Sequence, residues 1–223
     1  MTTNDVVSAL VRDLRPVVPL RAPTVRAWYW GFLAAVTGGI AVAVFGLRAD
    51  LAATASTLSF RVQAALLVLA TTMASGSALA FAIPGEHLSS IRRAAPIAAA
   101  LAWGAWLLAE LAAAAGSSST AWALDSGWGC VAKAMTIAAV PGAALMLMVG
   151  RGASVDPRRA VAYAALAAAG VGALGVEFTC PNPEVIHQLV WHFGPLAVLP
   201  LVAAPVGAPM FARWMRRPRE PRL

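Results

Sequence analysis

The sequence predicts an all-α polytopic membrane protein, a bundle of six transmembrane helices with both termini cytoplasmic. Of its 223 residues, 60% are hydrophobic and only 12% are charged, and the mean hydropathy is +0.72. A chain of this composition has too little polar surface to coat a soluble globule. The apolar residues also gather in six segments, each long enough to cross a bilayer core of about 30 Å as a helix.

The six predicted spans lie between charged or polar boundaries. They run Ala27–Leu47, Val62–Ile83, Ala94–Ala115, Trp128–Val149, Ala160–Thr179 and Gln188–Ala212. Prolines such as Pro141 and Pro200 fall inside them, which membrane bundles tolerate because neighbouring groups satisfy the freed backbone. The predicted organisation is a cytoplasmic segment over 1–26, a six-helix membrane domain over 27–212 and a basic cytoplasmic tail over 213–223.

Basic residues are distributed unevenly between the two sides of this predicted bundle. All but three of the 17 Lys and Arg residues fall in the N-terminal segment, the second and fourth loops and the C-terminal tail. The exceptions are Arg48, Arg61 and Lys133. By the positive-inside rule, both termini of this multi-pass chain are cytoplasmic. The net charge of +7 therefore reflects topology, and we predict no direct binding of nucleic acid.

The N-terminal segment predicts one short amphipathic helix. Thr3 or Asn4 is the expected cap, and Arg15-Pro16 ends the helix because a residue before proline avoids helical dihedrals. This helix either lies on the inner leaflet or docks into a groove on a cytoplasmic partner. The expected partner-binding residues are Val7, Leu10, Val11, Leu14 and Arg15.

Cys130 and Cys180 are the only cysteines, and they lie at matching ends of the hairpin formed by the fourth and fifth predicted spans. The predicted topology places both at one depth on the periplasmic side, where disulfides persist. Three interpretations remain open: a structural disulfide, a redox switch, and a metal-sensing site completed by His187 or His192. No compact Cys-x-x-Cys motif is present, so no cofactor is predicted beyond transient binding of a soft metal.

Three further ionisable residues, Glu110, Lys133 and Glu177, lie near the same outer ends of the predicted spans. Ionisable groups in membrane segments are costly and face a partner or the bundle interior. Lys133 is expected to pair with Glu110 or Glu177 and so to pin helices together. Alternatively, the three line the path of an inner-membrane transporter or channel for a small solute or metal. The sequence carries no catalytic signature, so no enzyme is predicted.

Several motifs together resemble one known family. They are Leu10-Val-Arg-Asp-Leu-Arg-Pro-Val17, Ile83-Pro-Gly85, Trp128-Gly-Cys130, Cys180-Pro-Asn182, His187 and Trp191-His192. Over essentially the whole chain they resemble the NrsF family, negative regulators of sigma F, which are six-span bacterial inner-membrane anti-sigma factors. The resemblance implies that the protein holds an extracytoplasmic-function sigma factor inactive. It also implies release of that factor when Cys130 and Cys180 sense oxidative or heavy-metal stress.

Overall fold

The computed structural model of the chain describes residues 2–12, 20–115 and 126–215. Within these residues the secondary structure is helical throughout, and no strand occurs. The elements are α1 (Thr3–Arg12), α2 (Pro23–Phe45), α3 (Leu51–Ser56), α4 (Leu58–Ala80), α5 (Ser90–Ala115), α6 (Trp128–Gly150), α7 (Pro157–Thr179), α8 (Val185–His187), the π-helix η2 (Gln188–Phe193) and α9 (Gly194–Met215).

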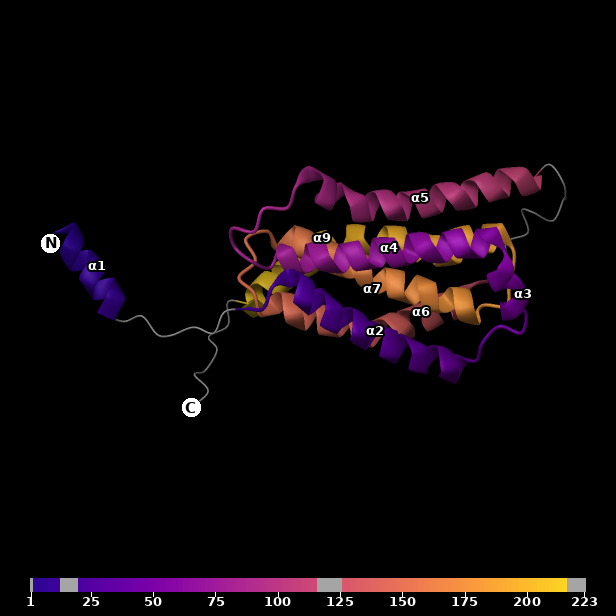
Figure 1. The fold of residues 1–223 in the computed structure, drawn as a ribbon, viewed down its shortest axis with the longest axis horizontal. Helices are drawn as coiled ribbons and strands as arrows, with labels where there is room; N and C mark the ends of the chain where they lie inside the picture. Colours follow the sequence, from indigo (N-terminus) through magenta and orange to yellow (C-terminus); the bar gives the residue numbers. More distant parts are fainter. Residues whose placement is uncertain (1, 13–19, 116–125, 216–223) are drawn as a thin grey trace.

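The long helices run side by side along one axis and form a bundle (Figure 1). Six helical segments are long and apolar enough to cross a membrane, the last being the continuous run Val185–Trp214. The chain is therefore a multi-pass membrane protein, and the predicted all-α class is confirmed. Helices α2, α4, α5 and α7 begin three or four residues before the predicted spans. The difference arises because helices continue into polar residues at the membrane boundary, which hydropathy alone leaves out.

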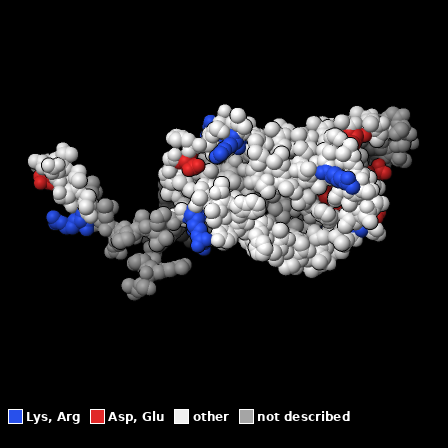
Figure 2. Space-filling model, in the orientation of Figure 1, with Lys and Arg blue, Asp and Glu red and all other residues white. Residues whose placement is uncertain are grey.

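The bundle has two chemically different ends. One end holds the start of α2, the loops over 81–89 and 151–156 and the end of α9, and we call it the basic end (Figure 1). The opposite end holds α3, the loop over 180–184 and the start of α6, and we call it the cysteine end. Charged side chains lie towards these two ends, and the surface between them carries none on the face that Figure 2 shows.

Helix α7 lies at the centre of the bundle. In the membrane-spanning window of α7, 72% of the residues are buried, whereas in that of α2 only 11% are buried. It packs against α4, α6 and α9, and small residues make the close approach possible. A Cβ atom on Gly172 would lie 2.5 Å from the backbone oxygen of Ala134 in α6, and one on Gly170 would lie 2.1 Å from Oγ1 of Thr71 in α4.

Helix α2 lies at the edge of the bundle and is attached to α6 by two polar side chains. Trp30, which is 1% exposed, donates from Nε1 to the carbonyl oxygen of Pro141 at 2.8 Å. Arg26 is also buried and donates to the carbonyl oxygen of Met148. These two bonds hold α2 against α6, because a buried donor in a membrane bundle has to find its acceptor within the protein.

At the basic end, the first turns of α7 are tied to two loops. Tyr163 donates from its hydroxyl to the carbonyl oxygen of Arg93 at 2.7 Å, and its ring stacks on Phe81 with centroids 5.6 Å apart. The loop before α7 is held as well, because Ala153 and Ser154 donate to the carbonyl oxygens of Ala82 and Phe81. A displacement of α7 would therefore also displace the residues that it contacts at the surface of the basic end.

Helix α1 has the predicted amphipathic character, but its cap is Thr2 rather than Thr3 or Asn4. Asp5 donates its backbone N–H to Thr2 Oγ1, and Thr2 donates its own N–H to Asp5 Oδ2, which is a reciprocal capping box. These bonds from Thr2 lower the pKa of Asp5.

Val7 and Val11 are 51% and 58% exposed, and α1 stands apart from the bundle in Figure 1. Leu14 and Arg15 lie outside the described residues.

The contact between α6 and α7 can be tested with two glycines in membrane-spanning helices. We expect Gly172→Ala to lower the free energy of unfolding in detergent by about 1–3 kcal/mol, because the new methyl group meets backbone and not a mobile side chain. Gly31→Ala in α2 is the matched control, since a Cβ there meets nothing within 4 Å. Equal unfolding midpoints for the two variants would contradict this packing.

Candidate functional site

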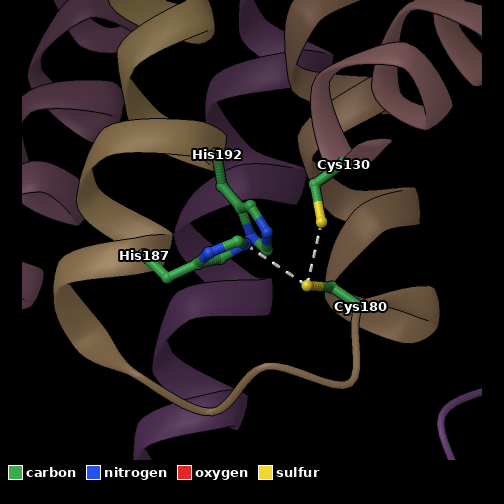
Figure 3. Close-up of side chains that lie close together, drawn as sticks. All are labelled: Cys130, Cys180, His187 and His192. Carbon is green, nitrogen blue, oxygen red and sulfur yellow. Dashed lines mark hydrogen bonds between the residues drawn. The ribbon is translucent and has the colours of Figure 1, made fainter. Parts of the chain in front are cut away.

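The two cysteines meet at the cysteine end, as the predicted hairpin requires. Cys130 lies in the first turn of α6, and Cys180 directly follows the last residue of α7. Their Sγ atoms are 3.1 Å apart and both are thiols (Figure 3). Cys180 is 1% exposed, and Cys130 is partly exposed. The pair therefore brings together the ends of two helices, through residues that lie 50 positions apart in the sequence.

Two histidines are brought to this thiol pair by the π-helix η2. In a regular α-helix, residues five apart are separated by about 140° around the axis. A π-helix repeats its hydrogen bonds at five residues, as in the bond from Gly194 N–H to the Leu189 oxygen, so residues five apart come close to one face. His187 and His192 thus lie together, with ring centroids 5.5 Å apart and both side chains buried.

Aromatic contacts on both sides hold η2 in place. The Trp191 ring lies so close to Gly127 that a Cβ there would be 2.1 Å from it, and it packs on Trp128 with centroids 5.1 Å apart. The Phe193 ring lies in the same way against Gly104 of α5. Trp128 is two residues before Cys130, so this contact sets the distance between the start of α6 and the histidines.

A buried carboxylate orients the second histidine. Glu177 Oε1 is 2.9 Å from Nδ1 of His192, and both side chains are about 3% exposed or less. This contact leaves Nε2 of His192 without a hydrogen-bond partner although it is buried. His187 Nε2 lies 3.6 Å from the Cys180 sulfur (Figure 3). One ligand atom from each of Cys130, Cys180, His187 and His192 can be chosen so that all four lie within 4.8 Å of one another.

The Cys180 thiol lies just beyond the span of α7, and its surroundings favour ionisation. The hydrogen bond with Cys130 lowers the pKa of Cys180 most strongly, and the nearby His192 ring lowers it further, against the effect of burial. The thiolate, and not the thiol, is the nucleophile and the metal ligand. The arrangement is therefore suited to disulfide formation and to binding of a soft metal.

Two of the predicted polar residues lie outside this group, and the predicted ion pair is wrong. Lys133 donates to the carbonyl oxygen of Thr179 at 3.4 Å and lies over the Phe45 ring. Glu110 instead accepts hydrogen bonds from Gln63 and Trp106. Only Glu177, through His192, joins the cysteines and histidines. Glu110 and Glu177 line one cavity, whose lining residues do not include Lys133.

Sequence reasoning missed the contact between Arg48 and Asp50, which lies beside the site. Arg48 donates its backbone N–H to the Phe178 oxygen, and its guanidinium group makes two hydrogen bonds to the Asp50 carboxylate at 2.6 and 2.8 Å. This pairing lowers the pKa of Asp50 to about 2. The spacing Arg48-x-Asp50 at the end of a predicted span was the available signal. Arg48, Asp50, Glu110 and Glu177 also line a cavity of about 410 Å³.

A family described as negative regulator of sigma F, NrsF, matches residues 10–214 of the chain. The chain belongs to the NrsF family. No curated protein and no solved structure matches it. Membership makes the chain a negative regulator of a sigma factor, an anti-sigma factor, within a family of regulators and not of enzymes. Cys130, Cys180, His187 and His192 all fall within the matched residues.

The thiol geometry predicts rapid and reversible crosslinking within one chain. We expect diamide to remove both alkylatable thiols of the purified protein and to lower its mass by two hydrogens, because the sulfur atoms already touch. A reductant should restore both thiols. Cys130→Ser is the control, in which Cys180 should remain alkylatable after the same treatment. Two free thiols in the oxidised native protein would show that the pair does not form a disulfide.

Proposed function

We propose that this NrsF protein holds an extracytoplasmic-function sigma factor at the inner membrane and releases it when its periplasmic cysteines react with an oxidant or a heavy metal. The observation that carries the proposal is the Cys130–Cys180 pair at one end of the bundle, with the exposed cationic surface at the other. An anti-sigma factor needs a binding surface inside the cell. A sensor of external stress needs its reactive groups outside.

The charge distribution supports this orientation. At the basic end, five arginines are exposed: Arg92, Arg93, Arg151, Arg158 and Arg159. At the cysteine end, Arg48 is buried against Asp50, and Lys133 points to a backbone oxygen. The positive-inside rule then places the basic end in the cytoplasm and the cysteine end in the periplasm. Both termini are cytoplasmic in this arrangement.

The sigma factor is proposed to dock on α1 and the basic end. Val7 and Val11 of α1 are more than half exposed, so their apolar stripe does not pack on the bundle. An exposed apolar stripe on a helix fits a hydrophobic groove of a partner. The neighbouring arginines would attract an acidic rim around such a groove. Leu10, Leu14 and Arg15 extend the same predicted stripe in the sequence.

With an oxidant, the proposed sensing reaction is disulfide formation. Cys130 and Cys180 lose two protons and two electrons, and one S–S bond forms. A peroxide as oxidant accepts the two electrons and is reduced to water. The two sulfur atoms, 3.1 Å apart as thiols, must approach to about 2.05 Å in the disulfide, which shifts the end of α7 relative to α6.

Helix α7 connects this reaction to the binding surface. Cys180 ends it, since the Cys180 N–H caps the helix on the Val176 oxygen. Its other end is bound to the loop over 151–156 and, through Tyr163, to Arg93 and Phe81. Close packing makes such a helix move as a unit, and interface shifts of about 1–2 Å are typical of signalling transitions. The shift is proposed to weaken docking at the basic end.

Docking can be tested by co-purifying the full chain with its candidate sigma factor. We expect Val7→Asn and Val11→Asn each to weaken binding about tenfold or more, because each removes apolar contact area from the stripe. Ser8→Asn changes the neighbouring polar position of the same helix and should bind as the parent does. If the two valine variants keep full affinity, α1 is not the docking element.

Release can be tested in membranes with an oxidant that does not cross the inner membrane. The parent protein should lose its bound sigma factor, whereas Cys130→Ser and Cys180→Ser should retain it, because neither can form the disulfide. Thr72→Ala in α4 is a control that keeps both thiols and should release normally, because the exposed Thr72 side chain bonds only to carbonyl oxygens of its own helix. Release from the cysteine variants would remove the sensing role, and no release from the parent would contradict the proposed orientation or coupling.

A further inference from the structure

We propose that Cys130, Cys180, His187 and His192 form a four-coordinate site for a thiophilic divalent ion of the Zn²⁺ and Cd²⁺ class. Two thiolates and two imidazoles are the donor set that such ions prefer in tetrahedral sites. The proposal deepens the proposed function, on which its regulatory meaning rests. Whether the ion binds can be decided separately, on the isolated protein.

The positions of the ligand atoms fit one ion. Tetrahedral coordination with usual Zn–S and Zn–N lengths separates ligand atoms by about 3.3–3.8 Å. The Cys130 and Cys180 sulfurs are 3.1 Å apart, and Cys180 Sγ lies 3.6 Å from His187 Nε2. With the chosen atom of His192 included, all four lie within 4.8 Å of one another. Movements of the ligand atoms by about an ångström complete the tetrahedron.

Among the four proposed ligands, His192 gives the strongest evidence for an ion-binding role. Its Nε2 atom is buried and makes no hydrogen bond, while its Nδ1 contacts Glu177. Burying a polar nitrogen without a partner is costly. Ligating histidines almost always donate their second ring N–H to a carboxylate or carbonyl, which fixes the tautomer and strengthens the ligand. Glu177 holds His192 in that way, with the lone pair of Nε2 available to an ion.

The charges also balance. Two thiolates and two neutral imidazoles around a divalent ion sum to zero, so the ion cancels the charge of the two thiolates that bind it. A cavity of about 410 Å³ lies beside the site at the cysteine end, and the carboxylates of Asp50, Glu110 and Glu177 line it. Of these, Glu177 contacts His192.

The ion and the disulfide exclude each other because both use the same two sulfurs. While an ion holds both thiolates, no S–S bond forms. Once the disulfide has formed, only the two histidines remain as ligands. A bound ion would therefore set how easily Cys130 and Cys180 are oxidised. This assigns to His187, His192 and Glu177 a part in the sensing that a plain dithiol switch does not require.

Co²⁺ binding to the full chain in detergent, with both thiols kept reduced, tests the site without any sigma factor. We expect one Co²⁺ per chain, the intense visible bands of tetrahedral coordination with a thiolate charge-transfer band, and displacement by Zn²⁺. His187→Ala and His192→Ala should each lose the tetrahedral spectrum. Glu177→Gln should keep it but bind about 10–100-fold more weakly, as expected for a residue that positions a ligand.

His87→Ala is the matched control, because His87 is the only other histidine and is exposed in the loop over 81–89. It should bind Co²⁺ as the parent does. The proposal is overturned if the reduced parent binds no Co²⁺. It is also overturned if both histidine variants keep the parent spectrum and affinity, which would mean that the thiols alone capture the ion. Neither result would affect the docking of a sigma factor, which is measured separately.

Discussion

A carboxylate buried inside a membrane bundle must have a partner, and the contact between Glu177 and His192 meets that requirement here. The contact joins α7, at the centre of the bundle, to the last membrane-spanning segment. It also orients the His192 ring so that its other nitrogen faces the cysteines. The thiol–imidazole group at the cysteine end therefore depends on one polar contact that the membrane environment makes obligatory.

The same end of the bundle contains its clearest departure from regular helix. The segment η2 is a π-helix, a rare form that often occurs at functional sites. Here it places His187 and His192 on one face, and the contacts of Trp191 and Phe193 with two glycines hold it in place. Local irregularity supported on both sides is typical of residues that are positioned for chemistry and not for packing alone.

The geometry also relates two distant surfaces. Helix α7 has 23 residues, so it is about 35 Å long, and it connects the cysteine end to the loops of the basic end. Its small residues allow α4 and α6 to approach closely, and close packing lets it move as one body. The two ends of the bundle are thus joined by one closely packed helix.

The sequence by itself determined the number and order of the spans, the charge asymmetry, the amphipathic α1 and the placement of Cys130 and Cys180 at one end of the bundle. These follow from hydropathy, charge and helix length, which act locally along the chain. Only the tertiary structure decided that His192 pairs with Glu177, that η2 is π-helical and that Lys133 contacts Thr179 instead of a carboxylate. The physical reason is that a membrane span with apolar residues on all sides has no polar face. Its sequence therefore does not specify how the helix is rotated about its own axis. Which side chains of neighbouring helices meet is then set by close packing and by the need to pair every buried polar group.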